Sequence, residues 1–150
     1  MTDNLNALEE WAGALLAKLS PGERRKLGNT IGRELRRNQQ KRIASQRNPD
    51  GTPYATRKPR ELRGKVGRIK RQMFARLRQA KHLRLQSTAD AIAIGFTGRV
   101  ARIARTHQYG LRDRPGRGQA DVQYERRELL GFTEADLDMI RTRLLEHLTG

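Results

Sequence analysis

Apolar residues recur every three or four positions over the first part of the chain, which is the spacing of one face of an α-helix. The first such stripe predicts a helix over residues 3–18 and consists of Leu5, Leu8, Trp11, Leu15 and Leu19. A second helix is predicted to begin at SPGE, because Ser20 can cap it, Pro21 suits its first turn and Glu23 completes a capping box. Its stripe of Leu27, Ile31 and Leu35 is predicted to end near Ala44. Residues 1–46 are therefore predicted to be the helical N-terminal part.

The stretch RNPDGTPY, residues 47–54, interrupts the helical pattern. Two prolines and an Asp-Gly pair predict a turn followed by extended backbone. The next residues, RKPRELRGKVGRIKR at 57–71, are mostly basic with interspersed glycines, and we expect 55–71 to form a flexible loop. Met73, Phe74 and Leu77 predict a short helix over 72–80, with these three side chains directed inward.

The period then changes to two. Leu83 and Leu85 alternate with polar residues, a turn follows, and Ile92, Ile94 and Phe96 alternate again, which predicts a β-hairpin. Helical spacing returns in RVARIARTHQYG, residues 99–110, with Val100, Ile103, Ala104 and His107 on one side and Gly110 placed to end the helix. A basic flexible loop is expected over 111–120, and Val122 and Tyr124 suggest a third strand of the sheet.

The last helix is predicted to begin after Thr133, with Asp136 completing the cap and Phe132 packing on Leu137. Its apolar stripe consists of Leu137, Ile140, Leu144 and Leu148. The predicted fold class is α+β: N-terminal helices, a small antiparallel β-sheet and a C-terminal helix packed on the sheet. A length of 150 residues suits a single domain over 1–150.

Composition shows an excess of positive charge and a small apolar fraction. The net charge is +16, with 32 Lys and Arg against 16 Asp and Glu, and hydrophobic residues make up 35%. Residues 1–20 and 120–150 sum to −2 and −3, whereas residues 49–84 sum to +10. Such a charge distribution attracts polyanions, or draws the basic middle of one subunit to the acidic ends of another. The sparse interior is expected to be completed on assembly.

Several classes of protein are not expected. The chain has no cysteine, so disulfides and thiolate chemistry are absent. The acidic start does not resemble a signal peptide, and no apolar run reaches the length of a membrane span, so no membrane partner is expected. His82, His107 and His147 do not form a metal-binding spacing, and no phosphate loop or nucleophile elbow is present. His107 fits either a general base with Tyr109 or Gln108 nearby or, more simply, a histidine near the end of a short helix that is hydrogen-bonded to backbone, at a helix end where a cation is also favoured. We expect no enzyme activity, metal or cofactor.

A basic nucleic-acid-binding module is the alternative. Residues 57–84 hold twelve Lys or Arg against one Glu, a density that binds phosphate through counterion release. Phe74 is the only aromatic residue in that stretch, so the aromatic side chains on which bases stack are missing. Recognition motifs for RNA or DNA sequence are also missing.

Three motifs in succession resemble the tail completion proteins of contractile-tailed temperate phages, also called virion morphogenesis proteins. They are NPDGTPY at 48–54, THQYG at 106–110 and Y-x-x-R-x-L-L-G-F at 124–132, and the match in order and spacing covers about residues 5–148. Tyr54 stands where relatives often have Trp, which keeps a flat aromatic residue after the turn. The motif residues are Pro49, Asp50, Gly51, Tyr54, His107, Gln108, Tyr109, Gly110, Arg127, Leu129, Leu130 and Gly131.

The resemblance implies a structural role in the virion, at the tail–neck region, with assembly in the host cytoplasm. Such a protein is expected to close the head-proximal end of the tail as a homo-oligomeric ring of six copies. Its implied partners are the tail tube or tail terminator and the neck or connector proteins. The ring would let DNA pass, so basic loops could contact DNA without reading its sequence. The candidate assembly or DNA-facing residues are Arg57, Lys58, Arg60, Arg112, Arg114 and Arg117.

Overall fold

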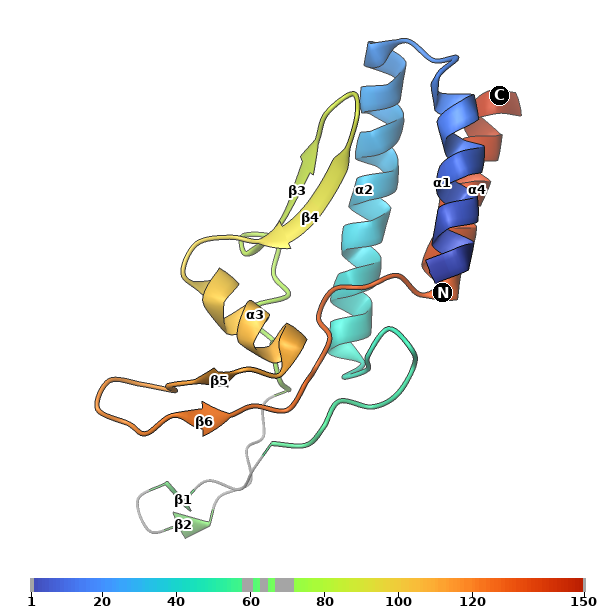
Figure 1. Ribbon diagram of the computed structural model, residues 1–150. Helices are drawn as coiled ribbons and strands as arrows, with labels where there is room; N and C mark the ends of the chain where they lie inside the picture. Colours follow the sequence, from blue (N-terminus) through green and yellow to red (C-terminus); the bar gives the residue numbers. More distant parts are fainter. Residues whose placement is uncertain (1, 58–60, 63–64, 67–71, 150) are drawn as a thin grey trace.

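The computed structural model describes residues 2–57, 61–62, 65–66 and 72–149. In this part of the chain, four helices and three antiparallel strand pairs give the predicted α+β class (Figure 1). The helices are α1 (Thr2–Leu16), α2 (Pro21–Ala44), α3 (Val100–Tyr109) and α4 (Glu134–Thr149). The strands are β1 (Glu61–Leu62), β2 (Lys65–Val66), β3 (Leu83–Ser87), β4 (Ile92–Phe96), β5 (Arg112–Asp113) and β6 (Val122–Gln123).

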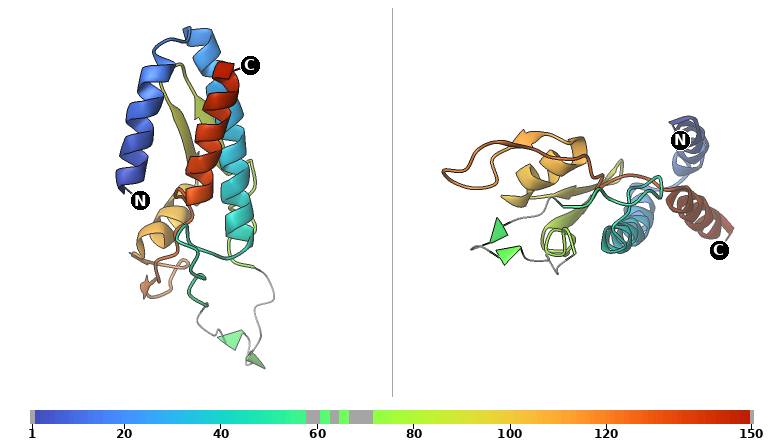
Figure 2. Two further views of the ribbon diagram at one scale, coloured as in Figure 1. Left: turned by 90° about the vertical axis from the view of Figure 1, so that its right-hand side faces the viewer. Right: turned by 90° about the horizontal axis from the view of Figure 1, so that it is seen from below.

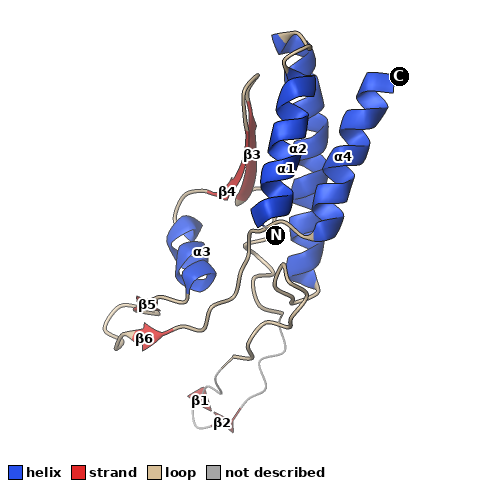
Figure 3. Cartoon of the chain, turned by 45° about the vertical axis from the view of Figure 1, so that its right-hand side comes forward, coloured by secondary structure: helices blue, strands red, loops and turns tan. Residues whose placement is uncertain are grey.

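Helix α2 is the centre of the arrangement, with the β3–β4 hairpin on one side and the α1–α4 pair on the other (Figures 1, 2 and 3). Local chemistry sets the helix ends as predicted. The Ser20 hydroxyl accepts a hydrogen bond from the Glu23 amide at 3.2 Å. At the start of α4, Thr133 and Asp136 cap each other, each side chain accepting from the other's amide at 3.0 Å. These bonds satisfy amides that a helix leaves unpaired in its first turn.

The predicted β3–β4 hairpin is present, with Leu83 opposite Phe96 and Leu85 opposite Ile94. Burial alternates along β3, whereas in β4 Ile92 and Ala93 are exposed and the residues from Ile94 to Phe96 are half-buried. The hairpin packs on α2 where Gly28 and Gly32 leave the helix surface bare. A Cβ on Gly32 would lie 2.6 Å from Cδ1 of Leu85, so this close approach depends on glycine. The two glycines therefore place the hairpin against the helix.

Two clusters of buried side chains form the interior. The first consists of Ile43, Tyr54, Leu77, Ala104 and Leu129. The second joins Leu27, Ile31 and Leu35 of α2 to Leu144 of α4, and Ile94 of the hairpin packs against it. The C-terminal helix thus packs against the sheet as predicted, through this second cluster.

Residues 72–80 are a series of turns, so the predicted helix is wrong. Phe74 has a φ of +67°, in the left-handed region that a helix cannot continue through. The Gln46 side-chain amide pairs with the backbone of Met73, accepting from its N–H at 3.0 Å and donating to its carbonyl at 2.9 Å. Leu77 is nevertheless buried, as the apolar spacing predicted. A long-range contact has outweighed the local helical pattern.

The third strand does not join the main hairpin. Val122 pairs with Asp113, so β5 and β6 form a separate hairpin that contains most of the expected 111–120 loop. Two side chains assigned to buried stripes face outward, since Trp11 is 37% and Ile103 48% exposed. Most of the 57–71 loop lies outside the described residues. The described parts of it include β1 and β2, which form one short antiparallel pair. Lys58 and Arg60 lie outside the described residues.

Candidate functional site

The three sequence motifs meet in space near the end of α2 (Figure 1). The Glu128 amide donates to Oδ1 of Asn48 at 2.8 Å, and the Tyr54 hydroxyl donates to the Glu128 carbonyl at 2.9 Å. The Arg127 amide donates to the His107 carbonyl at 2.8 Å. We call the contact region of residues 48–56, 106–110 and 124–132 the motif junction.

Gln108 connects helix α3 to the irregular segment before α4. Its Oε1 accepts from the amides of Leu129 at 2.8 Å and Leu130 at 2.9 Å, and its Nε2 donates to the Leu130 carbonyl at 2.9 Å. Residues 124–130 belong to no helix or strand, so no regular ladder of backbone hydrogen bonds pairs these groups. One side chain therefore replaces the hydrogen bonds that a sheet would supply.

Arg42 and Gln39 of α2 also form hydrogen bonds with the backbone of this segment. Arg42 donates to the carbonyls of Glu128 at 3.0 Å and Leu129 at 2.7 Å. Gln39 donates to the Gly131 carbonyl at 3.0 Å and accepts from its amide at 3.2 Å. Sequence reasoning missed both residues. A signal was present for Gln39, because it lies in register with the apolar stripe of α2 yet is polar, and it is 5% exposed.

Arg127 is a buried cation held by backbone carbonyls. Its Nε donates to Ala55 at 2.8 Å and its Nη2 to Thr56 at 3.1 Å, which ties the segment after the NPDGTPY turn to the junction. Arg127 is 5% exposed, and burial lowers the pKa of its guanidinium. Carbonyl oxygens thus supply much of the solvation that water would give.

His107 is part of an aromatic row at the junction. Its ring lies edge-on to Phe74 and Tyr124, with centroids 4.8 and 5.0 Å away. Burial, with the nearby charges of Arg127 and Arg57, lowers the pKa of His107 to about 4. Nη1 of Arg127 lies 3.3 Å from Nδ1, and since a guanidinium can only donate, Nδ1 accepts and the proton is on Nε2. His107 lies in the last turn of α3, and with this pKa it is neutral near pH 7, so it does not supply the positive charge that a helix end favours.

The remaining motif residues shape the backbone. Gly110 has a φ of +62° and ends α3, while Gly51 has a φ of +90° in the 48–51 turn. The Asp50 carboxylate accepts from the amide of Thr52 at 2.9 Å and from its hydroxyl, and these bonds lower the pKa of Asp50. A Cβ on Gly131 would lie only 2.5 Å from Cγ of Pro49, so two motifs touch where one has no side chain.

The basic candidates do not gather at one place. Arg112 and Arg117 are exposed on the β5–β6 hairpin, and Arg114 on the same hairpin pairs with Asp121 at 3.6 Å. This hairpin extends from the body of the molecule (Figure 1). Arg57 is half-buried and lines a cavity of about 700 Å³ beside His107 and Tyr124. The hairpin arginines therefore form a surface distinct from the motif junction.

Two further observations concern ligands and membranes. Among the residues that the structure describes, no three His, Cys, Asp or Glu side chains gather as metal ligands would. No described helix has the length and apolar character of a membrane span.

The polar side chains of the motif junction brace irregular backbone by hydrogen bonds. The sequence model of the phage virion morphogenesis family matches residues 3–149. The chain is 38% identical over 141 residues to tail completion protein S of Escherichia phage P2, covering 93% of this chain and 94% of the relative. No solved structure matches. This chain belongs to the phage virion morphogenesis family.

Proposed function

We propose that the protein completes phage tails at their head-proximal end, as a sixfold ring that joins the tail to the neck. The observation that carries this proposal is the similarity to a relative named tail completion protein S, which extends over nearly the full length of both chains. The fold supports it, because the motif residues maintain a shape and the opposite charges of different segments suit head-to-tail contact between subunits.

The test is an assembly experiment with a phage lacking this gene. Tails and filled heads from that phage are mixed with the purified protein, and joined infectious particles are counted. The proposal expects particles to appear only when the protein is added, and electron microscopy to place it at the tail–neck joint. Joining at the same rate without the protein would refute the proposal.

The β5–β6 hairpin is the surface we assign to joining or to DNA in the lumen. Changing Arg112, Arg114 and Arg117 together to Ser should leave the free energy of unfolding nearly unchanged, because surface substitutions away from buried contacts have small effects. Joining should fall at least tenfold. The matched control replaces three exposed cations of α2 by Ser, with the same loss of charge: Arg25, Lys26 and Arg33. Equal effects of the two triple variants would show that net charge alone matters.

Non-specific DNA contact is a second candidate function, favoured by the net charge of +16. Affinity for duplex DNA should fall steeply with salt, because bound arginines release counterions from phosphate. The hairpin triple variant should show a shallower dependence on salt than the α2 control. Equal salt dependence in both would assign the contact elsewhere.

A further inference from the structure

The cavity of about 700 Å³ beside His107 lies between α3, the β5–β6 hairpin, the turns of residues 72–77 and the segment that ends at Arg57. Ile103 of α3 lines it and is 48% exposed, although the apolar stripe of α3 predicted a buried side chain there. The other apolar and aromatic side chains of the wall include Met73, Phe74, Val122 and Tyr124. The cavity therefore leaves part of an apolar wall uncovered.

The same cavity has a surplus of positive charge and of hydrogen-bond donors. Its charged lining residues are Arg57, Arg76 and Arg127 against one carboxylate, Glu125. Arg127 donates to backbone carbonyls, whereas the half-buried Arg57 forms no hydrogen bond or ion pair within the described part of the chain. A guanidinium offers five N–H donors and pairs best with a carboxylate or a phosphate. The cavity thus suits an acidic group that is attached to an apolar body.

Helix α1 carries an exposed surface of the opposite kind. The helix contains three acidic residues and no lysine or arginine, and the first basic residue after it is Lys18. Ala7, Glu10, Trp11 and Ala14 are all exposed, Trp11 to 37%. Positions three, four and seven apart share one side of a helix, so we call these four residues the outer face of α1. Glu10 forms no ion pair within the described part of the chain.

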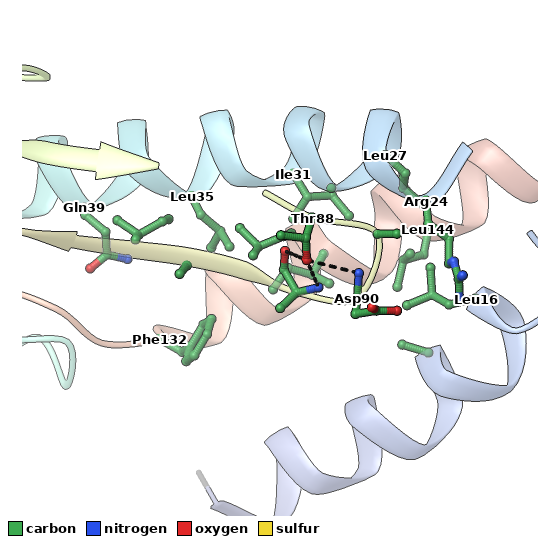
Figure 4. A pocket seen from close by; sticks show the side chains of 18 of the residues that line it. Leu16, Arg24, Leu27, Ile31, Leu35, Gln39, Thr88, Asp90, Phe132 and Leu144 are labelled. Carbon is green, nitrogen blue, oxygen red and sulfur yellow. Dashed lines mark hydrogen bonds between the residues drawn. The ribbon is translucent and has the colours of Figure 1, made fainter. Parts of the chain in front are cut away.

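The opposite side of α1 faces the rest of the protein. Leu8 is buried, and Ala12 and Leu16 line an apolar groove of about 560 Å³ between α1, α2, α4 and the β3–β4 hairpin (Figure 4). Trp11 lies outside the lining of this groove. Tryptophan is enriched in protein interfaces because its large ring contributes much apolar contact area. The outer face therefore presents an aromatic side chain and a free carboxylate next to each other.

We propose that the cavity beside Arg57 binds the outer face of α1 from a second copy of this chain. Trp11 packs on Ile103 and the apolar wall, and the Glu10 carboxylate accepts hydrogen bonds from the Arg57 guanidinium. Two apolar side chains that the fold leaves uncovered then cover each other, and an unpaired cation meets an unpaired carboxylate. Apolar and electrostatic complementarity at the same place favour one mutual orientation.

The two surfaces lie at opposite ends of the molecule, α1 beside α4 at one end and α3 with the β5–β6 hairpin at the other (Figures 1 and 2). Their surroundings also differ in charge, since α1 and α4 carry −3 and −2 and residues 99–119 carry +5. The contact is therefore heterologous, and repeated contacts of this kind form a ring when the rotation closes. The inference rests on the proposed function, for which it supplies the contact between subunits.

A charge swap tests the contact. Arg57→Glu and Glu10→Arg should each weaken self-association in sedimentation velocity by about tenfold or more, because each brings like charges together. Both changes in one chain reverse the ion pair and should restore association. Arg33→Glu on the exposed side of α2 and Glu9→Arg, about 200° around α1 from Trp11, are the controls and should associate like the wild type. A double variant that associates no better than either single variant would overturn the contact.

The fluorescence of Trp11 gives a second readout, because Trp11 is the only tryptophan in the chain. Its emission should move to shorter wavelength when the wild-type protein associates, since the ring leaves water. Arg57→Glu should remove this shift, and the charge-swapped double variant should recover it. Association of the wild-type protein with unchanged emission would show that Trp11 stays in solvent and would overturn the contact.

Cross-linking keeps both charges in place and is specific, because the natural chain has no cysteine. Ala7→Cys places a thiol on the outer face of α1, and Thr56→Cys places one at an exposed position of the cavity. Mixing these two variants with a short bis-maleimide should give a covalent dimer, whereas either variant alone should not. The control pairs Thr56→Cys with Ala91→Cys, at the exposed tip of the β3–β4 hairpin, and should give no dimer.

The two cysteine variants are then mixed and assembled with tails and heads. Infectious particles that contain both variants but no dimer linked through positions 7 and 56 would overturn the contact and leave the proposed function intact. Joining that no longer requires the protein would instead refute the proposed function. Binding of a duplex oligonucleotide or of a tail protein that is lost in Arg57→Glu, with self-association unchanged in that variant, would assign the cavity to another partner and overturn the contact.

Discussion

Replacing Gln108 by Leu removes the side chain that braces residues 129–130. Two amides and one carbonyl lose their partners at once, while the leucine keeps a similar volume. A buried polar group left unpaired costs roughly 1–3 kcal/mol, so three partly buried groups with some access of water give about 3–5 kcal/mol. That is a large part of the roughly 5–15 kcal/mol by which a domain is stable.

The measurement is urea unfolding followed by circular dichroism. With a slope of about 2 kcal/mol per M, the midpoint should fall by about 2 M. Gln108→Glu retains the two acceptor bonds but places a carboxylate oxygen against the Leu130 carbonyl, where Nε2 had donated, so it should also destabilise the protein, by about 1–3 kcal/mol. Gln119→Leu, on the exposed β5–β6 hairpin, is the control and should change the midpoint little. Equal midpoints for Gln108→Leu and the control would show that the bonds to Leu129 and Leu130 do not hold the junction together.

Three other predictions concern stability. Gly131→Ala should destabilise the protein by about 1–3 kcal/mol, because its Cβ would meet the rigid ring of Pro49 at 2.5 Å. The control is Gly13→Ala in α1, where a Cβ would have no atom within 4 Å, and it should stabilise the protein by up to about 1 kcal/mol. A lower melting temperature for Gly13→Ala than for Gly131→Ala would contradict the contact with Pro49. His107 should titrate near 4 in the folded protein by NMR. His107 binds a proton more readily in the unfolded state than in the folded state. Its contribution to the free energy of unfolding is therefore complete above pH 6.5 and is lost as the pH falls toward 4. The loss is about 2 kcal/mol after allowance for the partial exposure of the ring. A pH dependence unchanged in His107→Phe would argue against a buried neutral ring. Thr133→Ala should cost about 1 kcal/mol in urea unfolding by removing the cap of α4, and no loss would show that the cap bonds are dispensable.

Local chemistry made the helix starts and the main hairpin predictable. Ser20 and Thr133 bond to amides three residues away, and the two-residue alternation of apolar residues predicted the pairing of β3 with β4. The segment around Phe74 was not predictable in this way. Its conformation depends on hydrogen bonds with the distant Gln46 side chain and on contacts with the rings of Tyr54 and His107. A local sequence pattern does not include these distant partners.

The motif junction was predictable as a set of motifs and not as a set of contacts. Gln39 and Arg42 lie in α2, outside all three motifs, and reach the 128–131 backbone across about ninety residues of sequence. The sequence shows a polar residue in an apolar stripe at position 39, but its partners depend on the path of the chain. The exposure of Trp11 and Ile103 was also not predicted, because helical periodicity identifies an apolar face of a helix without showing whether other parts of the fold cover it.

Gln108 and Tyr109 are neighbours in one motif but have opposite environments. The Gln108 side chain is committed to the backbone of Leu129 and Leu130, whereas the neighbouring Tyr109 faces solvent. A chain with a sparse interior braces irregular segments with polar side chains, which fixes the geometry without requiring more apolar area. These bonds hold the backbone at the end of α3, next to the exposed Tyr109. A backbone held in place lowers the entropy lost when a partner binds there.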